Sequence, residues 1–386
     1  MKILTVNTFI ISFLIIALTA CSPNIIYPLR ESIVDTNNQT ITQQITINNG
    51  FKRDAELIRK NYEANLYTLP AFISGHYGLR MYRQTLDNKY AAAVWSDMAR
   101  VASRLNMFAN EVYTPEQIQK YSRKRVAGYL TDSTERNKIR YQVTQAMPEY
   151  IYLGVGLLGS MARANEYGLK HREDEKLRQV IRRYDFSKYA TDEGMIKAWA
   201  AQLANQVYWL RQLGEQDLVD EFIATFKKVY PDSDDASLSD QQFGNKIYGL
   251  THIIFAASGY YQYPINEQDH QWLYDYYRNN IDMIIARAKE DVIAEVGINF
   301  LLAGLDDDPV VLKTRKVIQQ ALNREYGLVP SVTGNLDLKK GEHRNVLAIM
   351  LLDWKGTHIA PTVSKQPEVF RSIPYGLVDK EFIVEN

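Results

Sequence analysis

Four consecutive residues near the C-terminal end of the chain carry four different groups that can do chemistry. Glu342, His343, Arg344 and Asn345 bring a carboxyl, an imidazole, a guanidinium and an amide directly before the apolar run at 346–352. Groups of these types transfer protons and bind anions or hydroxyls in enzyme sites. Because four consecutive side chains cannot all cap one helix, we expect them to contribute to a pocket.

Other polar residues lie in stretches that are otherwise apolar, where a polar group is either paired or functional. Glu295 and Asn299 stand four residues apart and therefore share one face of a helix. Most residues of this kind fall near the N-terminal ends of predicted helices, where the helix dipole favours anions. The candidate catalytic groups are Glu342, His343, His252 and Glu295. The candidate substrate-binding groups are Arg344, Asn345, Asn245, His76, Glu149 and Asn299.

Each of these positions also has a purely structural interpretation. Glu149 and Glu342 fall in first-turn positions, where a carboxylate can satisfy free backbone N–H groups. His252 can be a core histidine bonded to a carbonyl group. Glu295 and Asn299 can form an internal pair that holds neighbouring helices together. Both interpretations stay open at this point.

Composition excludes several classes of protein and site. The chain has 45 Lys plus Arg against 45 Asp plus Glu, a balance that argues against nucleic acid as a partner. It has no His-Glu-x-x-His pattern, no paired Cys or His spacing, no EF-hand loop and no glycine-rich phosphate loop. We therefore expect no metal and no cofactor.

The elements that must position these groups are helices of two kinds. One kind is amphipathic and charged, as at 172–184, 216–229 and 310–325. The other is apolar on nearly every face and must be covered on every face, as at 150–162, 247–257, 292–303 and 346–352. Outer helices that alternate with inner ones would produce this pattern.

A repeat supports an arrangement in layers. The apolar helices recur at Glu149, Ala198, Gly249, Val296 and Asn345, in steps of 47 to 51 residues. One such step accommodates a helical hairpin with its loops. The predicted fold is all-α, an α/α toroid of about six or seven helical hairpins, with an open α-solenoid as the alternative.

The single cysteine, Cys21, follows a short apolar segment and the residues Leu18-Thr19-Ala20. This pattern resembles the bacterial lipoprotein signal, in which the leader is removed and the cysteine receives lipid. Ser22 after such a cysteine implies the outer membrane, facing the periplasm. The expected organisation is a signal peptide at 1–20, a lipidated flexible tether at 21–50, the helical toroid at 51–354 and an irregular tail at 355–386.

The motifs at 245–252, 295–297 and 341–354 resemble those of a bacterial family of unknown function. The resemblance extends over roughly 54–354 and implies a shared fold without a mechanism. More distantly, the expected architecture is similar to that of α/α-toroid carbohydrate enzymes, both glycoside hydrolases and polysaccharide lyases. That similarity concerns the fold alone and transfers no residue.

Two hypotheses for function follow. The first is an envelope enzyme that acts on a polysaccharide or another glycan at the mouth of the toroid. Hydrolysis would use Glu342 with Glu295 or Glu149 as a carboxyl pair. Elimination would use His252 or His343 with a tyrosine, while Arg344 and Asn345 neutralise a uronate. The second hypothesis is a non-catalytic lipoprotein that binds a glycan or an envelope protein.

Overall fold

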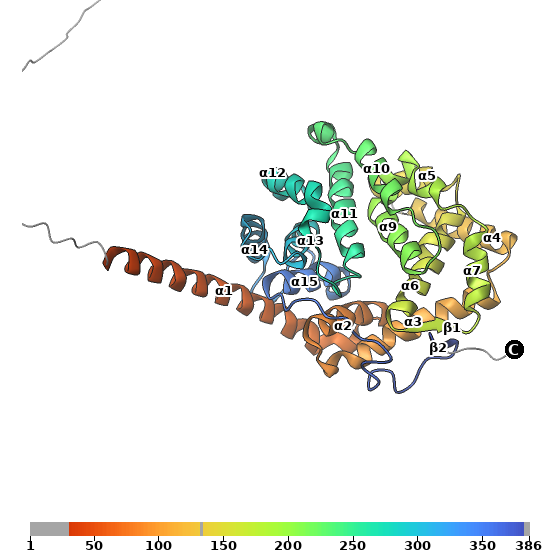
Figure 1. Cartoon of the computed structure of the whole chain (residues 1–386), viewed down its shortest axis with the longest axis horizontal. Helices are drawn as coiled ribbons and strands as arrows, with labels where there is room; N and C mark the ends of the chain where they lie inside the picture. The colour runs from red at the N-terminus through yellow and green to blue at the C-terminus, as the bar shows by residue number, and fades with distance from the viewer. Residues whose placement is uncertain (1–30, 132–133, 382–386) are drawn as a thin grey trace, which may run out of the picture. The chain divides into compact units, whose positions relative to one another are not determined.

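The computed structural model describes residues 31–131 and 134–381. About 71% of these described residues are helical, in about 16 helices, and the all-α class is therefore confirmed. Figure 1 shows the arrangement of the helices. By internal contacts the chain divides into two units, Met1–Asn48 and Asn49–Asn386. Helix α1 crosses this boundary, and every later element belongs to the second unit. Among the described residues, no helix has both the length and the apolar character that crossing a membrane requires.

The helices follow one another with short connections. The first half of the chain contains α1 (Glu31–Asn65), α2 (Ala71–Thr85), α3 (Ala91–Asn110), α4 (Pro115–Ala127), α5 (Glu135–Thr144), a π-helical segment η4 (Ile151–Leu158), α6 (Gly159–Glu166), α7 (Asp174–Arg182) and α8 (Ser187–Ala190). The second half contains α9 (Glu193–Gln212), α10 (Val219–Val229), α11 (Asp240–Ala257), α12 (Gln271–Arg287), α13 (Glu290–Leu302), α14 (Pro309–Ala321) and α15 (Leu338–Leu352). Short 3-10 turns lie at Leu66–Thr68, Asn88–Tyr90, Gly128–Thr131, Asp232–Ser237 and Glu267–His270.

The two kinds of helix expected from the sequence differ in burial as predicted. In α13 every residue from Val292 to Leu302 is buried, because apolar side chains cover all of its faces. In α10 only Val219, Phe222 and Phe226 are buried, at spacings of three and four that mark one face. Helix α10 can therefore cover α9 while its charged side faces water.

The helices of the second half pack in chain order. Helix α9 packs on α11, α11 on α13, and α13 on α15, while α14 lies against α13. Helix α15 in turn packs against α2, which packs on α3, and α3 continues to α6 and η4. The closest approaches use glycine: an added Cβ at Gly297 would lie 2.4 Å from the Thr314 hydroxyl. The closure of the helices into a toroid stays a prediction.

The segment after α15 runs across α2, α3 and α6 without regular structure for most of its length. Arg83 on α2 donates to the carbonyl oxygen of Ala360 at 3.0 Å, and Trp95 on α3 donates to that of Ser372 at 2.8 Å. Strand β2 (Leu377–Asp379) pairs antiparallel with β1 (Leu169–His171), with Lys170 opposite Val378. The tail is therefore held by side chains of the helices that donate to its carbonyl oxygens and by the backbone pairing of β2 with β1.

Two features differ from the expectation. The fold was predicted as all-α, yet the short strand β1 forms, because three residues are too few to show an alternating pattern. The described part of the predicted tether, 31–50, is helical within α1. That part of α1 contains no proline and only Gly50 as a glycine, so nothing in it stops a helix. Cys21 and the predicted signal peptide lie outside the described residues.

Candidate functional site

Five of the predicted site residues converge inside the second unit. They come from four helices: His76 from α2, His252 from α11, Glu295 from α13, and Glu342 and His343 from α15. Asp291, which was not predicted, joins them one turn before Glu295. We call these six residues the acid–histidine cluster.

Helix starts determine where the cluster residues sit. Asp337 caps α15, its side chain accepting from the backbone N–H of Lys340 at 2.8 Å, so that Glu342 and His343 fall in the second turn. In α13, Asp291 and Glu295 are four residues apart and point from the same face. Because α15 packs on both α13 and α2, the face with Glu342 and His343 meets Glu295 on one side and His76 on the other.

His343 lies between two carboxyl groups. Its Nδ1 is 3.5 Å from Oδ2 of Asp291, and its Nε2 is 3.6 Å from Oε1 of Glu295. The side chain of His343 is 32% exposed, whereas that of Glu295 is 1% exposed. Both distances exceed an ordinary hydrogen bond, so each leaves room for the ring or a bound molecule to adjust. His343 is thus an accessible imidazole with a carboxyl group at each ring nitrogen.

Glu295 and His252 face each other with unused hydrogen-bonding atoms. Oε2 of Glu295 accepts from the Thr251 hydroxyl at 2.7 Å, but its Oε1 is buried without a partner. Nε2 of His252 is also buried without a partner, 3.8 Å from that oxygen. Nδ1 of His252 lies 3.0 Å from Oδ1 of Asn205, which favours a proton on Nδ1 and a lone pair on Nε2. Two complementary atoms therefore point into the same small space.

The three carboxyl groups of the cluster differ in pKa and therefore in protonation state. Burial raises the pKa of Glu295 well above its ordinary range, and the nearby Asp291 adds to this shift. Burial also raises the pKa of Glu342 to about 7, although Arg80 and His343 oppose it. Burial alone would raise the pKa of Asp291, but the imidazole of His343 beside it holds this pKa below its ordinary value. At neutral pH the cluster therefore holds an acid at Glu295 and an anion at Asp291.

His252 and His76 are neutral. Burial is the main cause that lowers the pKa of His252 to about 3, and His343 and Arg80 contribute in the same direction. Burial likewise lowers the pKa of His76 well below 6.5. Nδ1 of His76 lies 2.7 Å from Oε2 of Glu342, so the protonated form of this carboxyl can donate to the ring. The His76 and His343 rings are 5.7 Å apart, which joins the two halves of the cluster.

The remaining predicted residues lie outside the cluster and bond to protein. Glu149 binds Lys188 at 2.8 Å and the Tyr189 hydroxyl at 2.9 Å. Asn245 donates to the carbonyl oxygen of Ile196 at 3.1 Å. The Asn299 side chain donates to the Tyr277 hydroxyl at 3.3 Å, away from Glu295. These side chains join neighbouring elements, although Asn299 does so with Tyr277 and not in the expected pair with Glu295.

Arg344 and Asn345 form hydrogen bonds with backbone groups. Arg344 donates to the carbonyl oxygen of Val329 at 2.9 Å, and Oδ1 of Asn345 accepts from the N–H of the same residue at 2.8 Å. They therefore fasten the loop before α15. Only the first two of the four consecutive polar residues reach the cluster.

Sequence reasoning missed two charged residues in or beside the cluster. Asp291 could have been found from its four-residue spacing to Glu295, the same signal that singled out Asn299. Arg80 stands four residues after His76 on α2 and lies near Glu342 and Glu295. Its own signal is weak, because arginine is common on helices. Across 31–131 and 134–381, no group of three or more His, Cys, Asp or Glu is arranged to hold a metal ion.

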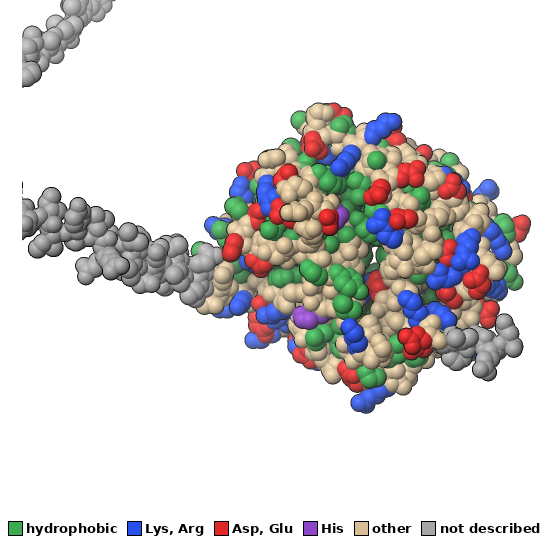
Figure 2. All heavy atoms as spheres, viewed as in Figure 1, with side chains coloured by type: hydrophobic (Ala, Val, Ile, Leu, Met, Phe, Trp, Pro, Cys, Tyr) green, Lys and Arg blue, Asp and Glu red, His purple; other side chains and the backbone are tan. Residues whose placement is uncertain are grey.

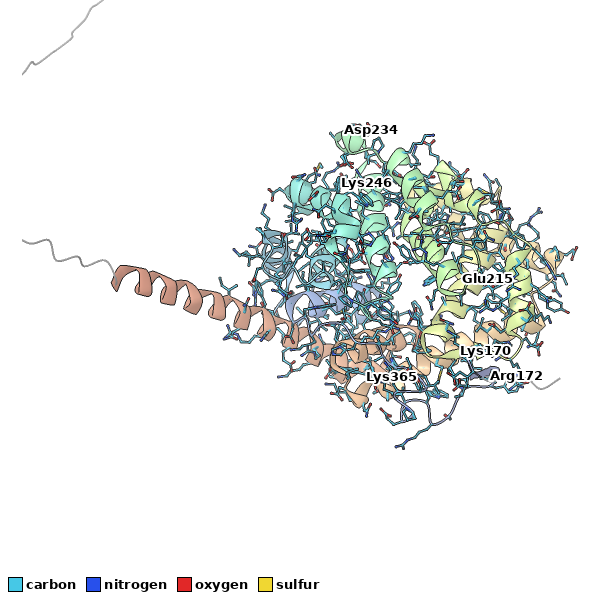
Figure 3. All side chains as sticks on the ribbon, viewed as in Figure 1. Lys170, Arg172, Glu215, Asp234, Lys246 and Lys365 are labelled. Atoms are coloured by element: carbon cyan, nitrogen blue, oxygen red, sulfur yellow. The ribbon has the colours of Figure 1, made fainter. Side chains whose placement is uncertain are left out.

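Two further buried ions of the second unit are paired and lie elsewhere. Lys246 on α11 binds Asp235 at 2.7 Å, and Glu215 binds Arg178 at 2.8 Å; Figure 3 shows Lys246 and Glu215 far from each other. On the visible face, charges of both signs are interspersed, and a narrow gap opens near its middle (Figure 2). This mixture is in keeping with the balanced composition.

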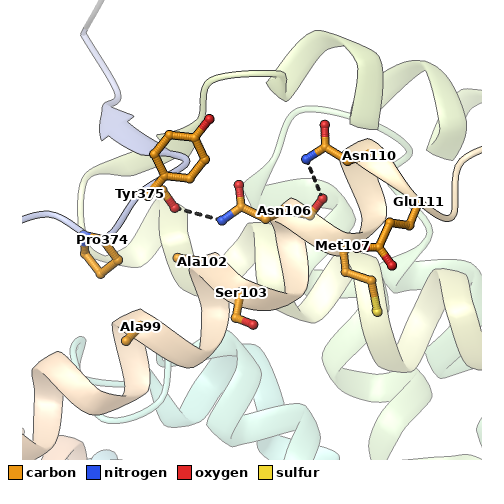
Figure 4. Close-up of a pocket in the computed structure, with 9 residues that line it drawn as sticks. All are labelled: Ala99, Ala102, Ser103, Asn106, Met107, Asn110, Glu111, Pro374 and Tyr375. Atoms are coloured by element: carbon orange, nitrogen blue, oxygen red, sulfur yellow. Dashed lines mark hydrogen bonds between the residues drawn. The ribbon is translucent and has the colours of Figure 1, made fainter.

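A surface groove lies away from the cluster, between α3 and the tail. It has a volume of about 610 Å³, and Asn106 on its floor donates to the carbonyl oxygen of Tyr375 at 2.8 Å (Figure 4). Glu111 is the one carboxyl residue of its lining. A lone carboxyl beside an open groove offers no acid–base pair, so we place the candidate chemistry in the cluster despite the size of this groove.

Residues 51–380 match one protein family, described as Domain of unknown function (DUF3541). The match confirms the expected resemblance to a family of unknown function and extends it into the tail. No curated protein and no solved structure matches the chain. The likeness to toroid carbohydrate enzymes stays a prediction.

Proposed function

Because the chain belongs to the DUF3541 family, whose function is unknown, its activity must be inferred from its own site, and we propose an acid–base enzyme that acts on a glycan. The observation that carries the proposal is the position of His343 between ionised Asp291 and neutral Glu295. A base and an acid within reach of one accessible ring are what proton transfer at a glycosidic bond needs.

In this proposal each cluster residue has a separate role. Asp291 orients His343 through Nδ1 and makes the ring a better base. In hydrolysis His343 would take a proton from water while Glu295 protonates the departing glycosidic oxygen. In elimination His343 would take a proton from a sugar carbon, and Glu295 would again protonate the oxygen that leaves. His252 completes the site by keeping a lone pair beside Glu295.

Two observations support a glycan as the substrate. Phe72 is 54% exposed, and its ring lies 6.1 Å from the ring of His76. An exposed aromatic face beside an acid–base site is suited to stack on a sugar ring.

We further propose that the inner helices close as an α/α toroid, and the packing of α15 on α2 supports this proposal. The cluster would then lie where the inner helices face one another.

A specific observation favours the alternative, a non-catalytic binding protein. The side chains of Glu295 and Glu342 are 1% and 3% exposed, and Glu342 is already bonded to His76. A closed network of this kind can hold helices in place without chemistry. In that case the glycan or envelope protein would bind around His343 and Phe72 without being changed.

We also propose that the chain is lipid-anchored in the bacterial envelope. Cys21 would carry the lipid, and Ser22 would direct the protein to the outer membrane, facing the periplasm. The pattern around the cysteine supports this proposal. Metabolic labelling with an alkyne palmitate, comparing the wild type with Cys21→Ser, tests it: a label that persists in Cys21→Ser would refute lipidation at this residue.

A glycan panel tests the catalytic proposal. The full chain, purified in detergent, is incubated with neutral, uronate-containing and sulfated polysaccharides. Reducing ends report hydrolysis, and the absorbance of unsaturated uronates together with reducing ends reports elimination. We expect one substrate class to turn over, and Glu295→Gln and His343→Gln each to lower the rate roughly hundredfold or more.

The matched control is Glu149→Gln, which also removes a buried carboxyl but lies outside the cluster. It should retain the activity of the wild type as long as it folds. Turnover that survives in both Glu295→Gln and His343→Gln would overturn the assignment of the site. Binding without any turnover would instead favour the non-catalytic alternative.

A further inference from the structure

Arg80 on α2 is a buried cation without a carboxylate partner. Only 8% of its surface is exposed, and it forms no ion pair with any residue that the structure describes. Its Nε is buried without a hydrogen bond, and its Nη1 reaches the carbonyl oxygen of His76 only at 3.5 Å. Its guanidinium carbon lies 5.8 Å from the centre of the Tyr261 ring, a contact that supplies no negative charge. A buried guanidinium without an anion is costly unless a ligand supplies one.

The neighbouring charges do not neutralise Arg80. Arg83 binds Glu166 at 2.7 Å, and Arg163 binds the same carboxylate at 3.0 Å. Arg100 and Arg163 share the second carboxylate, Asp97, at 2.8 and 3.3 Å. Three arginines thus divide two carboxylates between them, and the remaining carboxyl near Arg80, that of Glu342, is bonded to His76. Arg80 and these three arginines therefore outnumber the two paired carboxylates although the whole chain has a formal net charge of +0.

Arg80 is the innermost of three residues that lead from the surface inwards. Phe72, His76 and Arg80 stand four residues apart and share one face of α2. Their exposed fractions fall in that order, since Phe72 is open to solvent, His76 is partly covered and Arg80 is buried. A molecule that stacks on Phe72 and passes His76 would reach the guanidinium beside the cluster.

We propose that the glycan is acidic and that Arg80 binds its anionic group, an inference that rests on the proposed glycan activity of the cluster. The planar guanidinium can donate two parallel hydrogen bonds to a carboxylate or sulfate, and this fork is the reason why arginine is used for such groups. The substrate class is thus a uronate-containing or sulfated polysaccharide. Neutral glycans would leave Arg80 buried and unpaired.

For a uronate the proposal gives a balanced reaction. Arg80 binds the carboxylate and stabilises the negative charge that forms when the neighbouring carbon loses its proton to His343. The bond between the next carbon and the glycosidic oxygen breaks, and a carbon–carbon double bond forms between these two carbons. Glu295 gives its proton to the departing oxygen. No oxidant, reductant or further reactant is needed.

Binding of matched polysaccharides tests the proposal independently of turnover. The full chain in detergent, carrying His343→Gln to prevent turnover, is titrated by calorimetry with oligomers of polygalacturonate, their methyl esters, chondroitin sulfate, desulfated chondroitin and neutral galactan. We expect the acidic oligomers to bind roughly tenfold or more tightly than the esters and galactan. The uronate and sulfate members of the panel identify which anion Arg80 takes.

Arg80 is then changed in the same background. Arg80→Gln should remove most of the preference for acidic oligomers, and Arg80→Lys should restore part of it by keeping the charge without the fork. If Arg80→Gln does not fold, protection of Arg80 against phenylglyoxal in the wild type, located by mass spectrometry, replaces it. The acidic oligomer should protect Arg80, and the methyl ester should not.

The two proposals fail in different ways. Equal binding of acidic and neutral oligomers, no binding of either, or a preference that survives Arg80→Gln would overturn the role of Arg80. Turnover of a neutral glycan that depends on Glu295 would leave the proposed activity standing while refuting an acidic substrate. An acidic preference that depends on Arg80, without turnover by the wild type, would uphold the substrate class and refute catalysis.

Discussion

Glu342 should contribute more to the stability of the protein at low pH than at high pH. Burial raises the pKa of this carboxyl from 4.5 to about 7, while Arg80 and His343 act in the opposite direction. The folded protein therefore holds the proton of Glu342 more tightly than the unfolded chain does. Its contribution to stability is fully present below about pH 4.5 and is lost as the pH rises through about 7.

The size of the effect follows from the pKa shift. A difference between 4.5 and about 7 corresponds to about 3 kcal/mol in the free energy of unfolding between pH 4.5 and pH 8. Glu342→Gln removes this contribution, because glutamine does not titrate but can still bond His76 through its amide. The difference in stability between the wild type and the variant should therefore change by about 3 kcal/mol over this range, with the wild type relatively more stable at low pH.

Urea unfolding followed by circular dichroism at several pH values measures this difference. The pairwise comparison cancels the titration of groups common to both proteins. Glu149→Gln is the control with the opposite sign, since Lys188 and Tyr189 hold the pKa of Glu149 below its ordinary value against the effect of burial. Its stabilising contribution is present above the unfolded pKa and lost as the pH falls. A pH-independent difference between the wild type and Glu342→Gln would refute our account of this site.

Three further predictions concern packing, a buried ion and the orientation of the base. Gly297→Ala should destabilise the protein by roughly 1–3 kcal/mol in thermal or urea unfolding, because the added Cβ would lie 2.6 Å from Leu351. Gly244→Ala is the comparison, because an added Cβ there meets nothing within 4 Å, and it should instead stabilise the protein by about 0.5–1 kcal/mol. Asp97→Asn should cost about 3–5 kcal/mol, because it removes a buried carboxylate that is the partner of Arg100 and one of the two partners of Arg163, and an unchanged midpoint would contradict this. Asp291→Asn should lower turnover roughly tenfold or more and shift its pH profile while the protein stays folded; a full rate would exclude its role in orienting His343.

The helices could be predicted because the faces that a helix buries are visible in the sequence as apolar positions. A helix such as α13 is apolar on every face and must be covered, whereas α10 shows a single apolar face. Capping residues mark several helix starts, as Thr114 does for α4 and Asp308 for α14. The pairing of β1 with β2 could not be predicted in the same way. It joins residues about 200 positions apart in strands too short to carry a pattern.

The candidate site could be predicted only in part, because the sequence does not show how each helix is rotated about its axis. A polar residue on a buried helix stands out in the sequence, but the direction in which it points depends on how that helix is rotated against its neighbours. Glu295 and Asn299 share a helix face, yet Glu295 meets His252 and His343 while Asn299 bonds to Tyr277. Asp291 at the other side of Glu295 is the one that joins the cluster. Only the packing of α15 on α13 decides between them.

The free atoms at the centre argue for a ligand more strongly than any single residue does. Oε1 of Glu295 and Nε2 of His252 are 3.8 Å apart, and each forgoes a bond whose absence costs about 1–3 kcal/mol. Thr251 and Asn205 hold the two side chains by their other polar atoms, so that they do not close the remaining distance. A core shaped for stability alone would join these atoms or replace them with apolar groups. A hydroxyl in contact with both atoms could accept from the Glu295 acid and donate to the histidine, so the two atoms fit the substrate oxygen that the proposed function requires.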